Sequence, residues 1–109
     1  MSATSRSFVA FSVTREDDAG TVRVVVTGEV DVATADAVEQ AVQGVSAAGP
    51  DAILLDLSGV TFIDSTGLRI LLTLARTSRE NGNRLAMITS PPVDRVIDLA
   101  DVRRFLPLV

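Results

Sequence analysis

The feature that most constrains the fold is a change of hydrophobic period on either side of residue 65. Before it, Ala52-Ile53-Leu54-Leu55-Asp56-Leu57 is almost continuously apolar over the length of one strand, as in a strand covered on both faces. After it, from Leu68 to Glu80, apolar residues recur at the spacing of a helix. The stretch between, Asp64-Ser65-Thr66-Gly67, offers an acid and two hydroxyls, any of which could cap that helix. A buried strand leading into a helix predicts an α/β domain.

The chain before this stretch predicts a hairpin and a first helix. Phe8 to Thr14 alternates imperfectly and Val22 to Thr27 is rich in β-branched residues, with turn chemistry at Glu16 to Gly20 between them. After Gly28, a short loop leads to a helix that Asp31 or Thr34 can cap. Its apolar residues recur at spacings of three and four: Ala35, Val38, Ala41, Val42 and Val45. Ala47-Ala48-Gly49-Pro50 ends this helix, so strand, helix and strand follow one another at the length of a right-handed crossover.

The chain after it predicts a second crossover. Asn81-Gly82-Asn83 stops the long helix, and Arg84 to Thr89 is a buried strand. Ser90-Pro91-Pro92 opens a short helix, and Phe105 to Val109 forms a brief strand or coil. The positions in the short helix that are spaced for burial are Val93, Val96, Ile97 and Ala100. We expect one domain over residues 8–109, with a mixed, mostly parallel sheet and helices after strands two, three and four, preceded by a flexible N-terminus over residues 1–7.

Composition excludes several functions. The chain has no Cys, no His and no Lys, which removes thiol nucleophiles, imidazole bases, the usual zinc ligands and the lysine of a phosphate-binding loop. Its net charge is −4 and its Arg residues form no basic stripe, so we expect no nucleic-acid binding. No apolar stretch reaches the length of a membrane span, and the N-terminal apolar run is too short for a signal peptide. We expect a cytoplasmic protein that binds no membrane.

Polar residues are predicted to gather at one edge of the sheet. In sheets built from parallel crossovers, binding sites lie beyond the carboxyl ends of the strands. Three loops follow such ends, at Gly28–Val32, Ser58–Asp64 and Thr89–Pro92. If they share one edge, the side chains brought together there are Glu29, Asp31, Asp64, Ser65 and Thr66.

The enzymatic interpretations of these residues are weak. Asp56-Leu57-Ser58 resembles the aspartate of haloacid-dehalogenase phosphatases, but Ser58 stands where their second Asp belongs and no Lys supports it. Ser65 has no His base, so it is no triad nucleophile. Asp56 and Asp64 could bind Mg²⁺, although capping or surface carboxylates are commoner, and we expect neither a metal nor a cofactor. The two hypotheses left for Asp64-Ser65-Thr66-Gly67 are an ordinary helix cap and a phosphoacceptor site at Ser65.

The longest motif resembles a known family. Leu55-Asp56-Leu57-Ser58-Gly59-Val60-Thr61-Phe62-Ile63-Asp64-Ser65-Thr66-Gly67-Leu68 closely resembles the signature of STAS domains, in particular of bacterial anti-sigma factor antagonists. Gly28-Glu29-Val30-Asp31-Val32-Ala33-Thr34-Ala35 resembles that family's second common stretch. The resemblance covers about residues 8–106. It implies a cytoplasmic partner-switching protein that is not an enzyme.

The resemblance also implies a mechanism. In that family the unphosphorylated domain binds an anti-sigma factor that is also a serine kinase, which frees a sigma factor. Phosphorylation of the serine after the motif's Asp, here Ser65, ends the complex, and a phosphatase restores the binding form. Asp64, Thr66 and Gly67 are then expected at the partner surface, with Glu29 and Asp31 as further contacts. Family members commonly continue into another C-terminal helix, whereas this sequence ends at Val109. The flank of the sheet that such a helix would cover is then bare and could contact a second copy, so we expect a monomer or a weak homodimer.

Two other functions remain open. One is a STAS scaffold subunit of a lipid-transport or signalling assembly, which would use the same edge without phosphorylation. The other is a small-ligand sensor, which needs a sizeable pocket. With four aromatic residues and no buried polar cluster, the sequence shows no sign of such a pocket.

Overall fold

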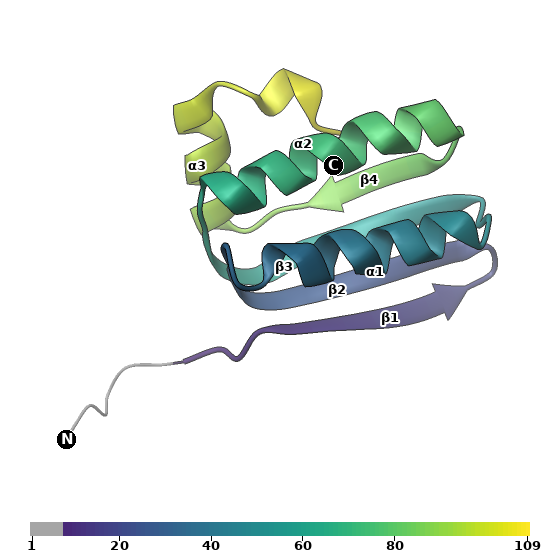
Figure 1. Ribbon diagram of the computed structural model, residues 1–109, viewed down its shortest axis with the longest axis horizontal. Coiled ribbons are helices and arrows are strands. Elements are labelled where there is room, and N and C mark those ends of the chain that lie inside the picture. Colours follow the sequence, from purple (N-terminus) through teal and green to yellow (C-terminus); the bar gives the residue numbers. More distant parts are fainter. Residues whose placement is uncertain (1–7) are drawn as a thin grey trace.

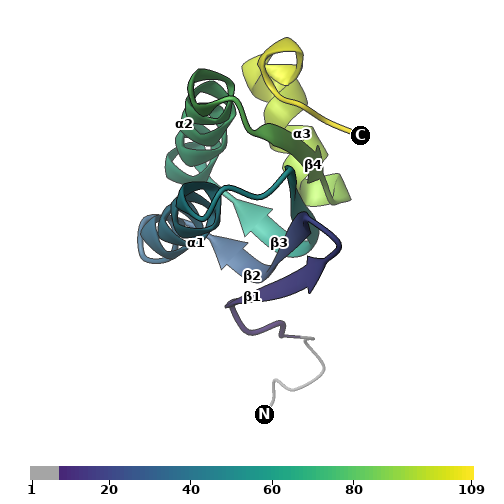
Figure 2. The same cartoon turned by 90° about the vertical axis from the view of Figure 1, so that its right-hand side faces the viewer.

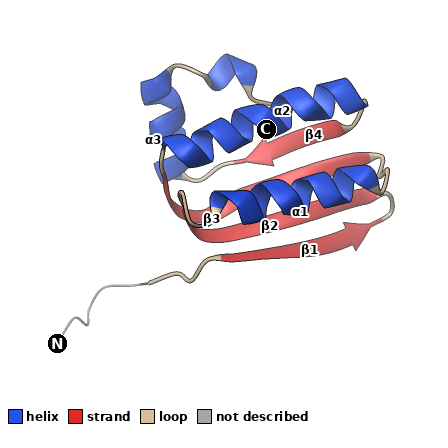
Figure 3. Ribbon diagram, in the orientation of Figure 1, coloured by secondary structure: helices blue, strands red, loops and turns tan. Residues whose placement is uncertain are grey.

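The computed structural model describes residues 8–109, so the predicted flexible segment 1–7 lies outside the described residues. Helices and strands alternate after an N-terminal hairpin (Figures 1 and 3). The strands are β1 Ser12–Asp18, β2 Thr21–Val30, β3 Ala52–Ile63 and β4 Arg84–Ile88, and the helices are α1 Ala35–Ala47, α2 Ser65–Asn81 and α3 Pro91–Ala100. The sheet order is β1-β2-β3-β4, with β1 antiparallel to β2 and the other pairs parallel. The predicted mixed, mostly parallel sheet is confirmed.

The hairpin is shifted relative to its predicted position. β1 begins at Ser12 rather than at Phe8, and it continues through Asp18, which was expected in the turn. The turn itself is only Ala19-Gly20, with φ of 50° and 89°. Two successive residues of positive φ make a turn whose twist matches that of the strands, so pairing continues up to Asp18 and Thr21.

Strands β2 and β3 are longer than predicted and extend together. β2 continues past Gly28 to Val30, and β3 continues past Leu57 to Ile63, through residues expected to form loops. Two register shifts, between Val25 and Thr27 and between Gly28 and Glu29, keep the two strands paired to their ends. Gly28 has φ +85°, and an added Cβ would lie 2.7 Å from the backbone of Phe11.

Helices α1 and α2 cover one face of the sheet, and α3 lies on the other side near β4 (Figure 2). The core lies between the first two helices and the sheet, because alternate residues of β2 and β3 point to that face. Its buried members include Val22, Val24, Val26, Ile53, Leu55, Leu57, Val38, Val42, Leu71 and Leu74. Ile70 of α2 is buried as well.

The end of the chain completes the β4 edge. Val93 and Ile97 of α3 are buried as predicted, but Ala100 is exposed because the helix ends there and Asp101 takes a left-handed conformation. A short 3-10 turn follows at Arg103–Phe105. The N–H of Met87 then donates to the carbonyl oxygen of Pro107 (2.9 Å), which pairs the last residues with β4. Within residues 8–109, no helix is long and apolar enough to cross a bilayer.

Candidate functional site

Asp64 is the residue that starts α2. It has an extended backbone, and its Oδ1 accepts a hydrogen bond from the N–H of Gly67 at 3.0 Å. Its carbonyl oxygen accepts the N–H of Leu68 at 2.9 Å, so it occupies the N-cap position. Of the three residues that could cap this helix, Asp64 is the one that does. Ser65 is consequently the first helical residue, and it is exposed.

Gly67 lets the first turn of α2 pack against the end of β2. Its φ is not in the left-handed region, so the requirement is steric rather than conformational. A Cβ at this position would lie 2.7 Å from Cγ1 of Ile63 and 2.8 Å from the carbonyl oxygen of Val30. Only glycine fits here without a shift of the backbone. Gly67 is buried and therefore supports the site instead of presenting a surface.

The loop between β2 and α1 is fixed by its own hydrogen bonds. The Asp31 Oδ1 accepts from the N–H of Ala33 at 2.9 Å, and the Thr34 hydroxyl donates to the carbonyl oxygen of Glu29 at 2.8 Å. Thr34 holds the N-cap position of α1, but its hydroxyl does not bond to the first turn of the helix. The Asp31 side chain thus orders the loop before the helix, and neither candidate caps α1 with its side chain.

These two segments meet at the carboxyl ends of β2 and β3. In the parallel register, Glu29 pairs with Phe62 and Val30 with Ile63, and the N–H of Asp64 donates to the carbonyl oxygen of Val30 at 3.3 Å. The sheet thereby brings together five residues that we call the acidic rim: Glu29, Asp31, Asp64, Ser65 and Thr66. Its side of the molecule is at the left in Figure 1.

The third predicted loop is set back from the acidic rim. β4 pairs with β3 only as far as Asp56 and Ile88, whereas β3 continues to Ile63. The Ser90 hydroxyl is buried and donates to the carbonyl oxygen of Val60 at 2.6 Å. Val60 precedes Asp64 by four residues of extended chain, about 13 Å at the usual rise of a strand. The loop Thr89–Pro92 thus follows the carboxyl end of a parallel strand and contacts the predicted loop Ser58–Asp64 at Val60, as one shared edge requires, but it lies further back than the acidic rim.

Charge and exposure differ among the members of the acidic rim. Ser65 and Glu29 are exposed, while Asp31, Asp64 and Thr66 are half-buried. The three carboxylates give the rim a negative charge, and the free N–H groups at the start of α2 place a partial positive charge beside Ser65. Across the part of the chain that the structure describes, no cluster of three or more carboxylates is placed to hold a metal ion.

Exposed apolar side chains that no sequence motif predicted border the acidic rim. Val32 is 77% exposed in the β2–α1 loop, and Phe62 is 47% exposed opposite Glu29. Phe8 is also exposed, and with Phe11 it lines a shallow hollow of about 140 Å³ that reaches Glu29 and Asp31. Val32 directly follows Asp31 and Phe62 precedes Asp64 by two residues, and this proximity in the sequence was the only available signal.

Asp56 lies away from the acidic rim, in the middle of β3 and on the sheet face opposite α1 and α2. Its side chain is 3% exposed and pairs with the guanidinium of Arg23 on β2. Burial acts to raise the pKa of Asp56, but hydrogen bonds from Ser58 and the charge of Arg23 outweigh it and hold the pKa below its ordinary value. This carboxylate is therefore paired within the sheet, and among the described residues it belongs to no cluster of three or more possible metal ligands.

Fold and site together define a class: small α/β domains with an N-terminal hairpin and a polar Asp-Ser motif where a long helix follows the longest strand. Comparison with known families agrees. The family model described as "Mlab, STAS domain" matches residues 12–108. The chain belongs to the STAS domain family.

Several proteins that this chain is similar to are described as anti-sigma factor antagonists. The anti-sigma-F factor antagonist RsfB of Mycobacterium tuberculosis is 41% identical over 73 residues, which are 67% of this chain and 57% of that protein. The match thus spans little more than half the length of that relative. The anti-sigma F factor antagonist of Paenibacillus polymyxa is 28% identical over 95 residues, 85% of this chain and 81% of that protein. The crystal structure of an anti-sigma factor antagonist from Mycobacterium paratuberculosis superposes with a TM-score of 0.80 at 34% identity, covering 91% of this chain and 85% of that chain.

Proposed function

We propose that this protein is an anti-sigma factor antagonist whose acidic rim binds an anti-sigma factor with serine kinase activity. The unphosphorylated form binds the anti-sigma factor, which thereby releases its sigma factor, and phosphorylation of Ser65 switches this binding off. The observation that carries the proposal is the position of Ser65, exposed at the first residue of α2 beside the capping Asp64. The names of the relatives support the same class of function.

The site geometry fits a phosphoacceptor that does not disturb the fold. A phosphate adds about −1.5 to −2 charges at neutral pH, and the N-terminus of a helix favours an anion. Arg69 is exposed one turn further along α2, and residues four apart are neighbours on a helix surface. Its guanidinium can therefore pair with a phosphate on Ser65. The hydroxyl already lies in solvent, so no core contact is lost.

The same phosphate would act strongly on a bound partner. Glu29, Asp31 and Asp64 make the rim negative, so its partner surface is expected to be positive or to tolerate only a limited negative charge. Val32 and Phe62 supply exposed apolar area at the border of this surface, and buried apolar anchors dominate the binding energy of many interfaces. An added dianion on Ser65 would oppose any acidic group of the partner and would have to be desolvated on docking. Binding is lost while the fold is kept.

Phosphorylation with purified components tests the acceptor. The chain is incubated with its cognate anti-sigma factor kinase and ATP, and the phosphate is located by mass spectrometry in wild type, Ser65→Ala and Thr66→Val. We expect label on Ser65 in wild type and in Thr66→Val, and none in Ser65→Ala. Label on Thr66, or unchanged label in Ser65→Ala, contradicts the assignment.

Binding measurements test the switch. Ser65→Asp should weaken binding to the kinase by at least about tenfold, which is about 1.4 kcal/mol, whereas Ser65→Ala should bind like wild type and should not be released by ATP. Far-UV circular dichroism and melting temperature should be the same in all three. A Ser65→Asp variant that binds normally would leave the rim as an interface without a phosphate switch.

That last result would favour a second function. The alternative candidate is the one that the sequence left open, a STAS scaffold subunit of a larger assembly for lipid transport or signalling. The matching family model is described as a STAS domain and names no anti-sigma factor. Such a subunit would use the acidic rim as a constant interface. Substitution of Val32 or Phe62 would then weaken assembly, while Ser65→Ala would change nothing that the assembly does.

A further inference from the structure

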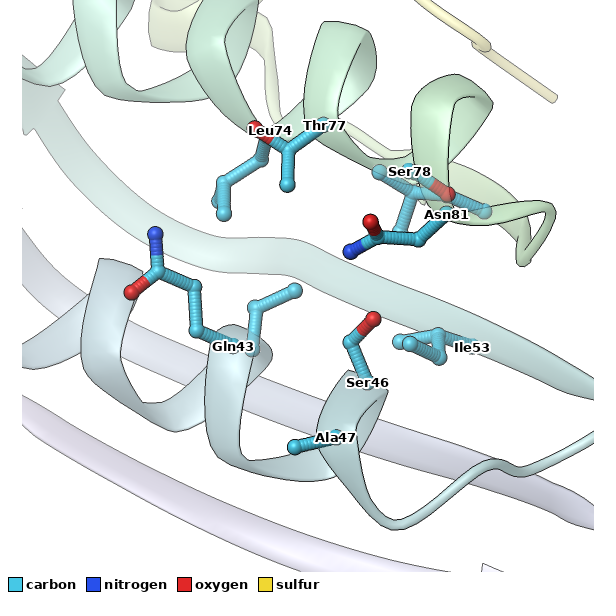
Figure 4. Close-up of a pocket in the computed structure, with 10 residues that line it drawn as sticks. Gln43, Ser46, Ala47, Ile53, Leu74, Thr77, Ser78 and Asn81 are labelled. Carbon is cyan, nitrogen blue, oxygen red and sulfur yellow. The ribbon is translucent and has the colours of Figure 1, made fainter.

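A hollow opens between the C-terminal halves of α1 and α2, although no pocket was expected from the sequence. Its volume is about 260 Å³. It lies over the start of β3 and β4, and the side chains of the two helices face each other across it (Figure 4). The lining residues are Val42, Gln43, Ser46, Ala47, Ile53, Leu74, Thr77, Ser78, Asn81 and Leu85.

The lining has an apolar floor and a polar, uncharged border. Val42, Ile53 and Leu74 are core residues whose outward surface forms the floor. Gln43 on α1 and Asn81 on α2 place side-chain amides at the border, and both residues are exposed (Figure 4). None of the lining residues carries a charge. An apolar floor with a few converging hydrogen-bonding groups is the usual composition of a small-molecule site.

The hollow results from small side chains that are held in place. Where two packed helices usually interdigitate large residues, α1 presents Ser46 and Ala47 and α2 presents Thr77 and Ser78. The Ser46 hydroxyl bonds to the side chain of Asn83, and the Ser78 hydroxyl donates to the carbonyl oxygen of Asn83 at 3.0 Å. Asn83 thus connects the ends of both helices. These bonds oppose collapse of the helices onto each other, so the space is a fixed feature of the fold.

We propose that this hollow is a binding site for a small uncharged amphiphile, with a hydrocarbon or aromatic body and one hydroxyl or amide group. A volume of 260 Å³ equals that of about nine water molecules in the liquid, which suits a ligand of about nine non-hydrogen atoms. The body would lie on Val42, Ile53 and Leu74, and the polar group would bond to Gln43 or Asn81. An anion such as a nucleotide or a fatty-acid carboxylate is disfavoured, because its charge would be desolvated with no cation in the lining.

This site is separate from the acidic rim. Ser65 and Asn81 are the two ends of α2, and its 17 residues span about 24 Å at the helical rise. The two proposals share no residue, so the failure of one leaves the other standing.

The test uses the full chain and 1-octanol, an uncharged alcohol of about nine non-hydrogen atoms. A ¹H–¹⁵N correlation titration should give saturable shifts at Gln43, Ser46, Thr77 and Asn81, with none at Ser65, and a Kd below about 1 mM. Octanoate, which has the same chain and a carboxylate, should bind at least about tenfold more weakly.

Two neighbouring alanines supply matched variants. Ala47 lines the hollow and Ala48 does not, and both are exposed at the end of α1. Ala47→Trp places a ring in the opening and should weaken octanol binding at least about tenfold, whereas Ala48→Trp should leave the Kd unchanged. Equal binding by both variants, or shifts that centre on Val32 and Phe62 instead, would overturn the proposal. So would octanoate binding as tightly as octanol.

Discussion

Replacement of Gly67 by alanine tests the packing that positions the acidic rim. Three contacts of the added Cβ would be shorter than 3.0 Å: 2.7 Å to Ile63 Cγ1, 2.8 Å to the Val30 carbonyl oxygen and 2.9 Å to Val30 Cγ1. The Val30 oxygen already accepts the N–H of Asp64, so it cannot move without loosening that bond. Overpacking of this kind costs about 1–3 kcal/mol, against a gain of about 0.5–1 kcal/mol from replacing glycine in a helix. We expect a net loss of about 1–2 kcal/mol.

Gly44 provides the matched control. It lies inside α1, it is exposed, and an added Cβ would meet nothing within 4 Å. Gly44→Ala should therefore stabilise the domain by about 0.5–1 kcal/mol. Urea unfolding followed by circular dichroism measures both variants, and the dependence on urea should stay unchanged. At about 2.1 cal/mol/K of unfolding entropy per residue, the 109 residues convert 1 kcal/mol into about 4 °C of melting temperature. If Gly67→Ala and Gly44→Ala shift the free energy of unfolding in the same direction, the steric argument is refuted.

Two further substitutions test the hairpin and the buried ion pair. Ala19→Asn should raise the free energy of unfolding by about 1 kcal/mol, because asparagine tolerates the positive φ of 50° better than alanine. A lower free energy of unfolding in urea would contradict the turn geometry. Asp56 has a lowered pKa in the folded chain, so its ionised form stabilises the fold above about pH 4, and this contribution disappears as the pH falls through the folded-state pKa. Melting temperatures of wild type and Asp56→Asn should differ at neutral pH and converge in acid, whereas a constant difference would exclude Asp56 as the cause.

Helix positions were predictable from the sequence, because the signals that define them are local. The period of apolar residues located α2, and Gly82, with φ of 76°, ends it as the Asn-Gly-Asn stretch predicts. Strand lengths were not predictable in the same way. Ser58-Gly59 has the composition of a turn, yet it stays in β3 because β2 continues beside it with a compensating register shift. That pairing joins residues about thirty positions apart and leaves no local trace.

The acidic rim could be predicted only in part, because it depends on strand pairing as well as on local signals. Two parallel neighbours must end on the same side of a sheet, so the loop after β2 and the start of α2 were correctly expected at one edge. The place of the third loop depends on the end of β4 at Ile88 and on the contact of Ser90 with Val60. The hollow between α1 and α2 depends on which small residues face each other across two helices. Neither relation follows from the period of one segment.

The hydrogen bonds of the acidic rim separate its structural role from its proposed switching role. An oxygen of Asp64 is committed to the N–H of Gly67, and one of Asp31 to the N–H of Ala33, so these carboxylates hold the backbone whatever happens at Ser65. Loss of a cap costs about 1 kcal/mol of stability, so an Asp64 variant changes both the geometry of the rim and its charge. A loss of partner binding in such a variant could not be assigned to one of the two causes. Ser65 caps nothing, and a change there alters only what faces a partner. The physical case for a switch therefore rests on substitutions at Ser65, with Asp64 variants as the measure of how much binding depends on a rigid rim.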